Sequence, residues 1–134
     1  MQFTVEHIGL AARDPVALKN WYLSALGARM ILDTGQSPPA FFLELPGGCC
    51  VEIYKGDTAA VETQNNRLAG WRHIALRVRS IDEARKHLDS RGIQFPEPPK
   101  PAGGGGQILF FQDCEGNLLH LVERPDSSPL RARL

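Results

Sequence analysis

Two stretches of this chain resemble each other, and the repeat limits the folds that are open to it. Glu6-His7-Ile8-Gly9-Leu10 returns 66 residues later as Arg72-His73-Ile74-Ala75-Leu76. Each copy alternates as a β-strand does, and a segment with helical spacing and further strand-like segments follow it. One half can bury only one face of its sheet under its own helix, so the other face needs a partner. The sequence therefore predicts an α+β fold of two tandem βαβββ modules, paired as a cupped, barrel-like mixed sheet with the helices outside.

The length of 134 residues fits one domain, and we expect a single domain over residues 1–134. Its predicted parts are a first module at about 3–55, a polar linker at 56–70, a second module at about 71–124 and a tail at 125–134. The tail is expected to be ordered only if it docks on the rest of the chain.

Local signals mark the helices and strands of the first module. Asp14 is a favoured N-cap, Pro15 suits the first helical position, and Gly27 is typical of the residue that follows a helix. The strands of this module are expected at residues 3–11, 29–33, 40–45 and 49–55.

The second module has the same order of signals. Ser80 is the candidate N-cap of a helix that stops by Gly92, and residues 96–106 are rich in proline and glycine. That segment is either a mobile lid or a long connection. The strands are expected at residues 73–79, 93–95, 107–112 and 117–124, the second of them being weak.

Composition excludes several classes of protein. Fifteen Lys and Arg balance fifteen Asp and Glu, so neither nucleic acid nor an anionic membrane is an expected partner. No apolar run is long enough to span a membrane, and the N-terminus lacks the basic start of a signal peptide. Three cysteines, two of them adjacent at Cys49 and Cys50, do not form a disulfide framework. We expect a cytoplasmic protein with a small molecule as its partner.

Strand parity indicates which side chains face away from the helices, into the predicted cup. In four strands the apolar side chains that suit the helix side leave one histidine or glutamate on the other face. These four residues are His7, Glu52, His73 and His120. Three imidazoles and a carboxylate suit a borderline divalent metal, and burying even one of them unpaired would cost about 1–3 kcal/mol. The sequence therefore predicts a metal site, the alternative being four separate hydrogen-bonded structural residues.

Three other residues share this face by parity and are candidates for contacting a substrate. Cys50 is either a substrate contact or a small apolar filler. Tyr54 could donate a hydrogen bond to a substrate oxygen or belong to the rim. Arg77 could hold a carboxylate or thioester oxygen, or pair with an acid at the strand end. Glu123 is expected on the opposite face from His120.

Four segments of the chain carry a resemblance to a known family: VEHIGLAARDPVALKNWYLSALGARM, CCVEIYKG, WRHIALRVRSIDEARKHL and FFQDCEGNLLHLVER. Over residues 3–124 the sequence resembles the vicinal oxygen chelate superfamily, which includes glyoxalase I, methylmalonyl-CoA epimerase, fosfomycin-resistance proteins and extradiol dioxygenases. The resemblance implies paired βαβββ modules around a cup, and ligands on the first, fourth, fifth and eighth strands. Carried over, these ligands are His7, Glu52, His73 and His120.

The resemblance implies a metal-dependent lyase or isomerase that acts on a small carbonyl or thioester compound chelated through two oxygens, with His120 and Glu52 in catalytic roles. The ion is expected to be Zn, Ni, Co, Mn or Fe, and the chain is expected to form a homodimer. The alternatives are a non-haem iron dioxygenase, which needs two histidines and a carboxylate, and a non-catalytic protein that binds a drug and confers resistance. The family usually has glutamate where this chain has His120, so glyoxalase I activity itself is not expected.

Overall fold

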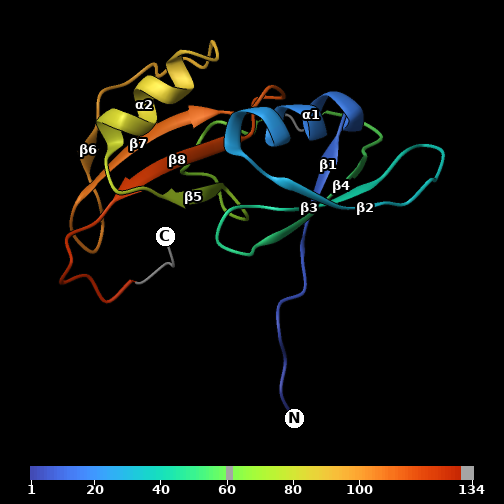
Figure 1. Cartoon of the computed structure of the whole chain (residues 1–134), viewed down its shortest axis with the longest axis horizontal. Helices are drawn as coiled ribbons and strands as arrows, with labels where there is room; N and C mark the ends of the chain where they lie inside the picture. The colour runs from blue at the N-terminus through green and yellow to red at the C-terminus, as the bar shows by residue number, and fades with distance from the viewer. Residues whose placement is uncertain (60–61, 131–134) are drawn as a thin grey trace. The chain divides into compact units, whose positions relative to one another are not determined.

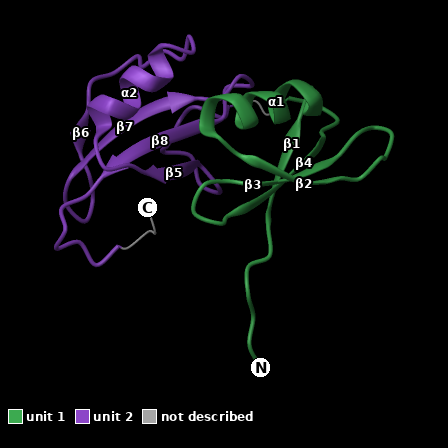
Figure 2. Ribbon diagram, viewed as in Figure 1, with its two compact units in different colours: residues 1–61 green, residues 62–134 purple. Residues whose placement is uncertain are grey.

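A computed structural model describes residues 1–59 and 62–130, and the chain divides into two compact units (Figures 1 and 2). Unit 1 comprises residues 1–61 and unit 2 comprises residues 62–134. The elements of unit 1 are β1 (Ile8–Ala12), α1 (Pro15–Leu26), β2 (Arg29–Asp33), β3 (Phe41–Glu44) and β4 (Cys50–Lys55). Those of unit 2 are β5 (His73–Arg77), α2 (Ile81–Asp89), β6 (Lys100–Pro101), β7 (Gln107–Gln112) and β8 (Leu118–Glu123).

Both units have the same topology. The strand order is β1-β4-β3-β2 in one sheet and β5-β8-β7-β6 in the other. In each sheet the first and fourth strands are parallel, and the other neighbours are antiparallel. The predicted α+β class and the βαβββ repeat are therefore confirmed. Among the described strands, the first strand of each module pairs with the fourth, so each unit holds a four-stranded sheet of its own.

In unit 1 the helix begins and ends where the sequence predicts. Asp14 Oδ1 accepts a hydrogen bond from the Ala17 amide at 3.0 Å, and Gly27 adopts the left-handed conformation (φ 67°) that glycine tolerates best. The helix packs on β1, β3 and β4. Apolar side chains of the helix and of the sheet are fully buried, as the alternation in β4 predicts. They include Leu18, Tyr22, Leu43, Val51 and Ile53.

In unit 2 the helix α2 lies on β7 and β8. Ser80 Oγ accepts from the Glu83 amide at 3.2 Å, which confirms the predicted N-cap. Glu123 Oε2 accepts from the Ile81 amide at 2.8 Å, so this carboxylate lies on the helix side of β8, as parity predicts. A carboxylate at a helix N-terminus also suits the helix dipole.

Two expected strands differ from the observed ones. Residues 93–95 form no strand; Ile93 is buried and the Phe95 ring lies 5.5 Å from that of Phe111, so this segment fills the core under the sheet. The edge strand is instead β6, which pairs antiparallel with β7. The prolines that follow residue 95 lack the amide hydrogens that a ladder needs. In unit 1 the strand expected from residue 3 begins only at Ile8.

The segment rich in glycine and the tail are both bound to the rest of unit 2. The Arg124 guanidinium donates to the carbonyls of Gly103 and Gly105. Arg77 donates from Nη1 to the Leu130 carbonyl at 3.0 Å, and Ser128 is buried. Residues 125–130 therefore dock on unit 2, as an ordered tail requires.

Gly106 is expected to be the least replaceable residue of this glycine-rich segment. A Cβ at Gly106 would lie 1.9 Å from the Glu123 carbonyl oxygen, and φ is 86°. We expect Gly106→Ala to lower the free energy of unfolding by about 3 kcal/mol or more. The cost of the positive φ for alanine and the overlap of its Cβ with the Glu123 backbone both destabilise the folded state. Gly103→Ala is the matched control, since a Cβ there meets nothing within 4 Å. Urea unfolding followed by circular dichroism measures both, and equal midpoints for the two variants would contradict the expectation.

Candidate functional site

Unit 1 brings together two of the four predicted ligands. His7 directly precedes β1, and Glu52 lies in β4, which runs parallel to β1. His7 Nε2 is 3.4 Å from Glu52 Oε2, and the two side chains are 34% and 29% exposed. His7 Nδ1 lies 3.6 Å from Glu6 Oε1. The pair is therefore accessible from solvent, with one nitrogen and one carboxylate oxygen close enough to share a ligand.

Unit 2 brings together the other two predicted ligands, His73 and His120. His73 is the first residue of β5, and His120 lies in β8 opposite Ala75. The two imidazole rings are 4.5 Å apart between centroids. His73 Nδ1 is 2.8 Å from Asn66 Oδ1, and an amide oxygen only accepts, so Nδ1 carries the proton. The Nε2 lone pair of His73 is then available to a ligand, which is the usual arrangement of a metal-binding histidine.

His120 is the residue whose surroundings are most unusual. It is 7% exposed, and within the described part of the chain neither ring nitrogen has a hydrogen-bond partner. Burial, together with the nearby His73 and Arg124, lowers the pKa of His120 from its ordinary value of 6.5 to about 4. The imidazole is therefore neutral at neutral pH. A buried polar group without a partner is costly, and a metal ion on a ring nitrogen would satisfy it.

Each unit by itself gathers two of the four predicted donor residues, His7 with Glu52 and His73 with His120. Within either unit, no three His, Cys, Asp or Glu side chains of the described residues form a cluster that could hold an ion. The three imidazoles and the carboxylate are the donors that borderline divalent metals prefer, and the unpartnered nitrogens of His120 are consistent with a ligand role.

Two predicted substrate contacts, Cys50 and Tyr54, lie in β4. Cys50 is half-buried, and burial raises the pKa of its thiol, helped by the nearby Cys49 and by glutamates. The thiol is thus protonated at neutral pH and is a poor nucleophile. Tyr54 is 39% exposed, and its ring lies against Gly9, where a Cβ would be 3.3 Å from the ring. A substrate role for either residue stays a prediction.

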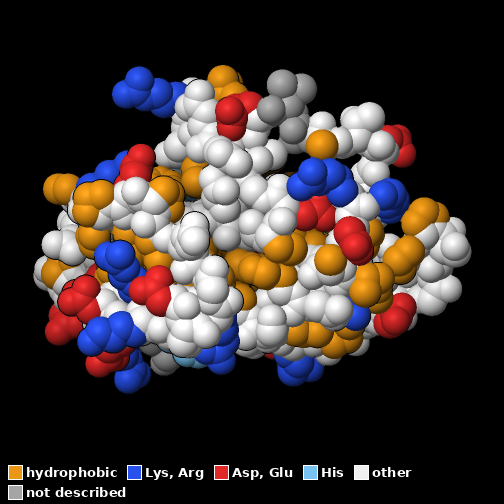
Figure 3. All heavy atoms as spheres, turned by 90° about the horizontal axis from the view of Figure 1, so that it is seen from above, with side chains coloured by type: hydrophobic (Ala, Val, Ile, Leu, Met, Phe, Trp, Pro, Cys, Tyr) orange, Lys and Arg blue, Asp and Glu red, His pale blue; other side chains and the backbone are white. Residues whose placement is uncertain are grey.

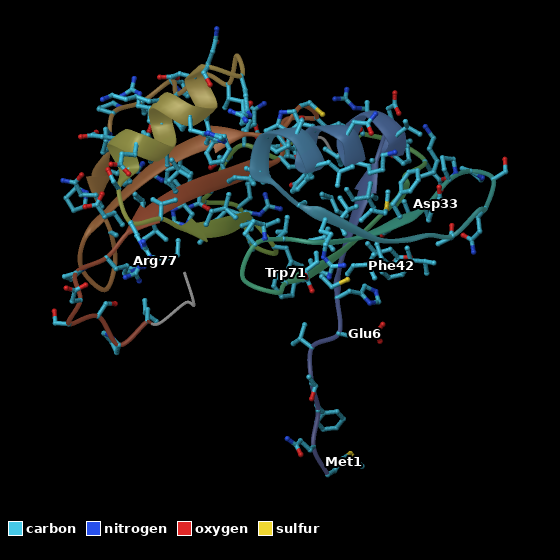
Figure 4. The ribbon with its side chains drawn as sticks, viewed as in Figure 1. Met1, Glu6, Asp33, Phe42, Trp71 and Arg77 are labelled. Carbon is cyan, nitrogen blue, oxygen red and sulfur yellow. The ribbon has the colours of Figure 1, made fainter. Side chains whose placement is uncertain are left out.

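Arg77, the third predicted substrate contact, lies in β5 and is labelled in Figure 4. Its guanidinium donates to the carbonyls of Leu130 and Arg124, at 3.0 Å and 3.4 Å. Its Nε is buried without a hydrogen-bond partner among the described residues. The docked tail therefore uses the donors that we assigned to a substrate anion, and the substrate role of Arg77 stays a prediction.

Three residues that neither the motifs nor strand parity singled out contact the candidate ligands. Asn66 holds His73, and Phe42 and Phe110 lie edge-on to His7 and His73. The two phenylalanines could have been found from alternation, because Leu43 and Leu109 next to them occupy the buried face. Asn66 offers no comparable signal, since it lies in the linker.

The stability of the metal-free protein is expected to fall in mild acid because of His120. An ordinary histidine in the unfolded chain binds a proton near pH 6.5, whereas folded His120 does so only near pH 4. The contribution of His120 to the free energy of unfolding is therefore fully present above pH 6.5 and is lost as the pH falls toward 4. We expect this residue to lower the free energy of unfolding by about 2 kcal/mol between pH 7 and pH 5. Urea unfolding in a chelator measures it, and His120→Gln should remove this part of the pH dependence. An unchanged dependence in that variant would contradict the assignment.

Two further features of the described residues are the distribution of their charged side chains and the length of their helices. Acidic and basic side chains are interspersed on the face drawn in Figure 3. Among the described residues, no helix is long and apolar enough to cross a membrane.

Other proteins resemble this chain in fold and in sequence. Solved structures with the same fold include FosX, a fosfomycin resistance protein of Listeria monocytogenes in complex with Mn(II) and 1S,2S-dihydroxypropylphosphonic acid (TM-score 0.69, 21% identity, 94% of each chain covered). A glyoxylase/bleomycin resistance protein/dioxygenase domain from Frankia sp. EAN1pec has a TM-score of 0.73 at 22% identity, covering 95% of this chain and 96% of that one. An uncharacterized protein of Bacillus subtilis, YwkD, is 26% identical over 124 residues, 90% of this chain and 97% of the relative.

The model of the Glyoxalase/Bleomycin resistance protein/Dioxygenase superfamily matches residues 4–121. The chain belongs to this superfamily, as the resemblance implied.

Proposed function

We propose that this protein is a divalent-metal-dependent enzyme, a lyase or isomerase that acts on a small carbonyl or thioester compound. The observation that carries the proposal is His120, a buried neutral imidazole that lies beside a second histidine and has no hydrogen-bond partner among the described residues. The ligands in this proposal are His7, Glu52, His73 and His120. A divalent ion bound by them would supply Lewis-acid stabilisation of negative charge on two substrate oxygens. The Mn(II) in the FosX structure supports a divalent ion.

The residues of the chain then have distinct tasks. Asn66 fixes the tautomer of His73, and the neighbouring Glu6 carboxylate lies close to His7 Nδ1. Glu52 and His120 are the groups proposed to accept a proton from the substrate. With its pKa near 4, His120 keeps its lone pair at neutral pH but is a weak proton acceptor. Cys50, Tyr54 and Arg77 are proposed to contact the substrate.

Elemental analysis of protein produced without a histidine tag tests the proposal. We expect a divalent transition metal at a constant ratio to the chain, removed by a chelator and restored on adding the ion. Nickel, cobalt or zinc would favour a lyase or isomerase. Protein that binds none of these ions after reconstitution would contradict the proposal and favour a small-molecule binding protein.

Iron would favour the second candidate, a non-haem iron dioxygenase. The observation that supports it is the donor set itself, since two histidines and a carboxylate suffice for such a centre. Consumption of oxygen with a catechol would separate this reaction from proton transfer.

We also propose that the protein is a homodimer in the cytoplasm. Each sheet has two edge strands, and Phe3 and Val5 in the segment before β1 are 87% and 82% exposed. Pairing with a second copy would cover such edges and side chains. Cys49 and Cys50 form no disulfide bond among the described residues, which suits a reducing compartment.

Light scattering is expected to give twice the chain mass of 14.8 kDa. Replacing Phe3 and Val5 together by serine should weaken the dimer, because both side chains would lose an apolar partner. The matched control is Thr4→Ser, which changes the same segment without removing a large apolar side chain. A monomer at micromolar concentration for the unmodified protein would contradict this prediction.

A further inference from the structure

Each unit places a phenylalanine edge-on to its first candidate ligand. In unit 1 the rings of Phe42 and His7 are 5.3 Å apart with an interplanar angle of 88°. In unit 2 the rings of Phe110 and His73 are 6.1 Å apart with the same angle. Edge-to-face contact at such distances is a favoured geometry for aromatic rings. The same contact thus recurs in both halves of the repeat.

The same phenylalanines also lie directly opposite the second candidate ligand of each unit. Phe42 in β3 pairs with Glu52 in β4, and Phe110 in β7 pairs with His120 in β8. Side chains at opposed positions of antiparallel strands are close neighbours. In unit 2 the contact is a stack, with the rings of Phe110 and His120 5.0 Å apart and 20° from parallel. One phenylalanine per unit therefore adjoins both candidate ligands.

The neighbouring residues show that these rings do not simply fill the core. Phe41 and Phe111, adjacent in sequence, are 4% and 1% exposed and lie on the other face of each strand. Phe42 and Phe110 are only half-buried, on the face of the ligands. The Phe110 ring is itself held, because Lys100 Nζ lies 4.8 Å from its centroid.

We propose that Phe42 and Phe110 are positioning residues that fix the orientation of the metal ligands, an inference that rests on the proposed function of those ligands. An imidazole turns about a broad torsion unless something restrains it. His120 has no hydrogen bond for this purpose among the described residues, so the flat contact with Phe110 sets its plane. Ligands held in place before the ion arrives lose less freedom on binding it.

The test is the affinity for Co(II), followed by titration of the visible absorption of the bound ion. We expect Phe110→Leu to weaken binding by about 10–100-fold, as the loss of a supporting partner does in metal sites, and to change the absorption spectrum. Phe110→Tyr keeps the ring and should restore both the affinity and the spectrum. Phe42→Leu should have a smaller effect of the same sign, because the His7–Glu52 pair is partly exposed.

Phe111→Leu is the matched control, the same substitution one residue away on the helix side. It should lower the thermal midpoint of unfolding yet leave Co(II) affinity within about threefold of the unmodified protein. If the unmodified protein binds Co(II) and Phe110→Leu binds it equally well with the same spectrum, the positioning role is wrong and the metal site stands. If the unmodified protein binds no Co(II), the proposed function fails and this inference fails with it.

Discussion

His73→Ala is expected to abolish stoichiometric binding of a divalent ion, and His7→Ala is expected to do the same. Each removes an imidazole that is proposed to donate directly to the ion. The loss in affinity should exceed about 100-fold, since even groups that only support a ligand are worth roughly 10–100-fold. In His73→Ala the remaining His120 also loses the ring beside it. Equilibrium dialysis with metal analysis measures the number of ions bound per chain.

Glu123→Gln is the control for this experiment. Its carboxylate accepts from the Ile81 amide on the helix side of β8, and a glutamine can accept the same hydrogen bond. The variant should keep both the fold and the ion. If Glu123→Gln lost the ion while His120→Ala kept it, the ligand assignment in β8 would be wrong.

The unmodified protein is expected to be nearly inert toward the hemithioacetal of methylglyoxal and glutathione, and His120→Glu is expected to gain measurable turnover. Burial holds the pKa of His120 near 4, so the imidazole is a weak acceptor for the carbon-bound proton of this substrate. A glutamate at this position supplies a carboxylate for that step. A well-placed general base contributes roughly 10²–10⁴ in rate, which an absorbance assay of the thioester product resolves.

His120→Gln is the control, because glutamine fills a similar position without a group that accepts a proton at neutral pH. It should remain as inactive as the unmodified protein. High activity in the unmodified protein that is lost in His120→Glu would show that the imidazole itself is the base.

Much of the fold could be predicted because its signals are local or periodic. The caps at Asp14 and Ser80 and the alternation in β4 and β8 depend on neighbours within a few residues, and the 66-residue repeat can be read by comparing the sequence with itself. The same alternation placed Glu123 on the helix side, as observed. It also selected the residues that each unit brings together, His7 with Glu52 and His73 with His120.

The remaining features depend on contacts between residues that are distant in sequence. The prolines after residue 95 and the burial of Ile93 against the sheet moved the edge strand to β6. Arg77 bonds to a tail that lies 53 residues away. No periodic pattern encodes such a contact, because it depends on where the chain returns after several turns.

By itself, the sequence determined the repeat, the class of fold and which face of each strand carries the polar groups, since these follow from period and local propensity. Only the tertiary structure decided that His120 lacks a hydrogen-bond partner within the described part of the chain, and that Phe42 and Phe110 adjoin the candidate ligands. Alternation assigns a side chain to a face. The register of the neighbouring strand, set by pairing across the sheet, decides what it touches there.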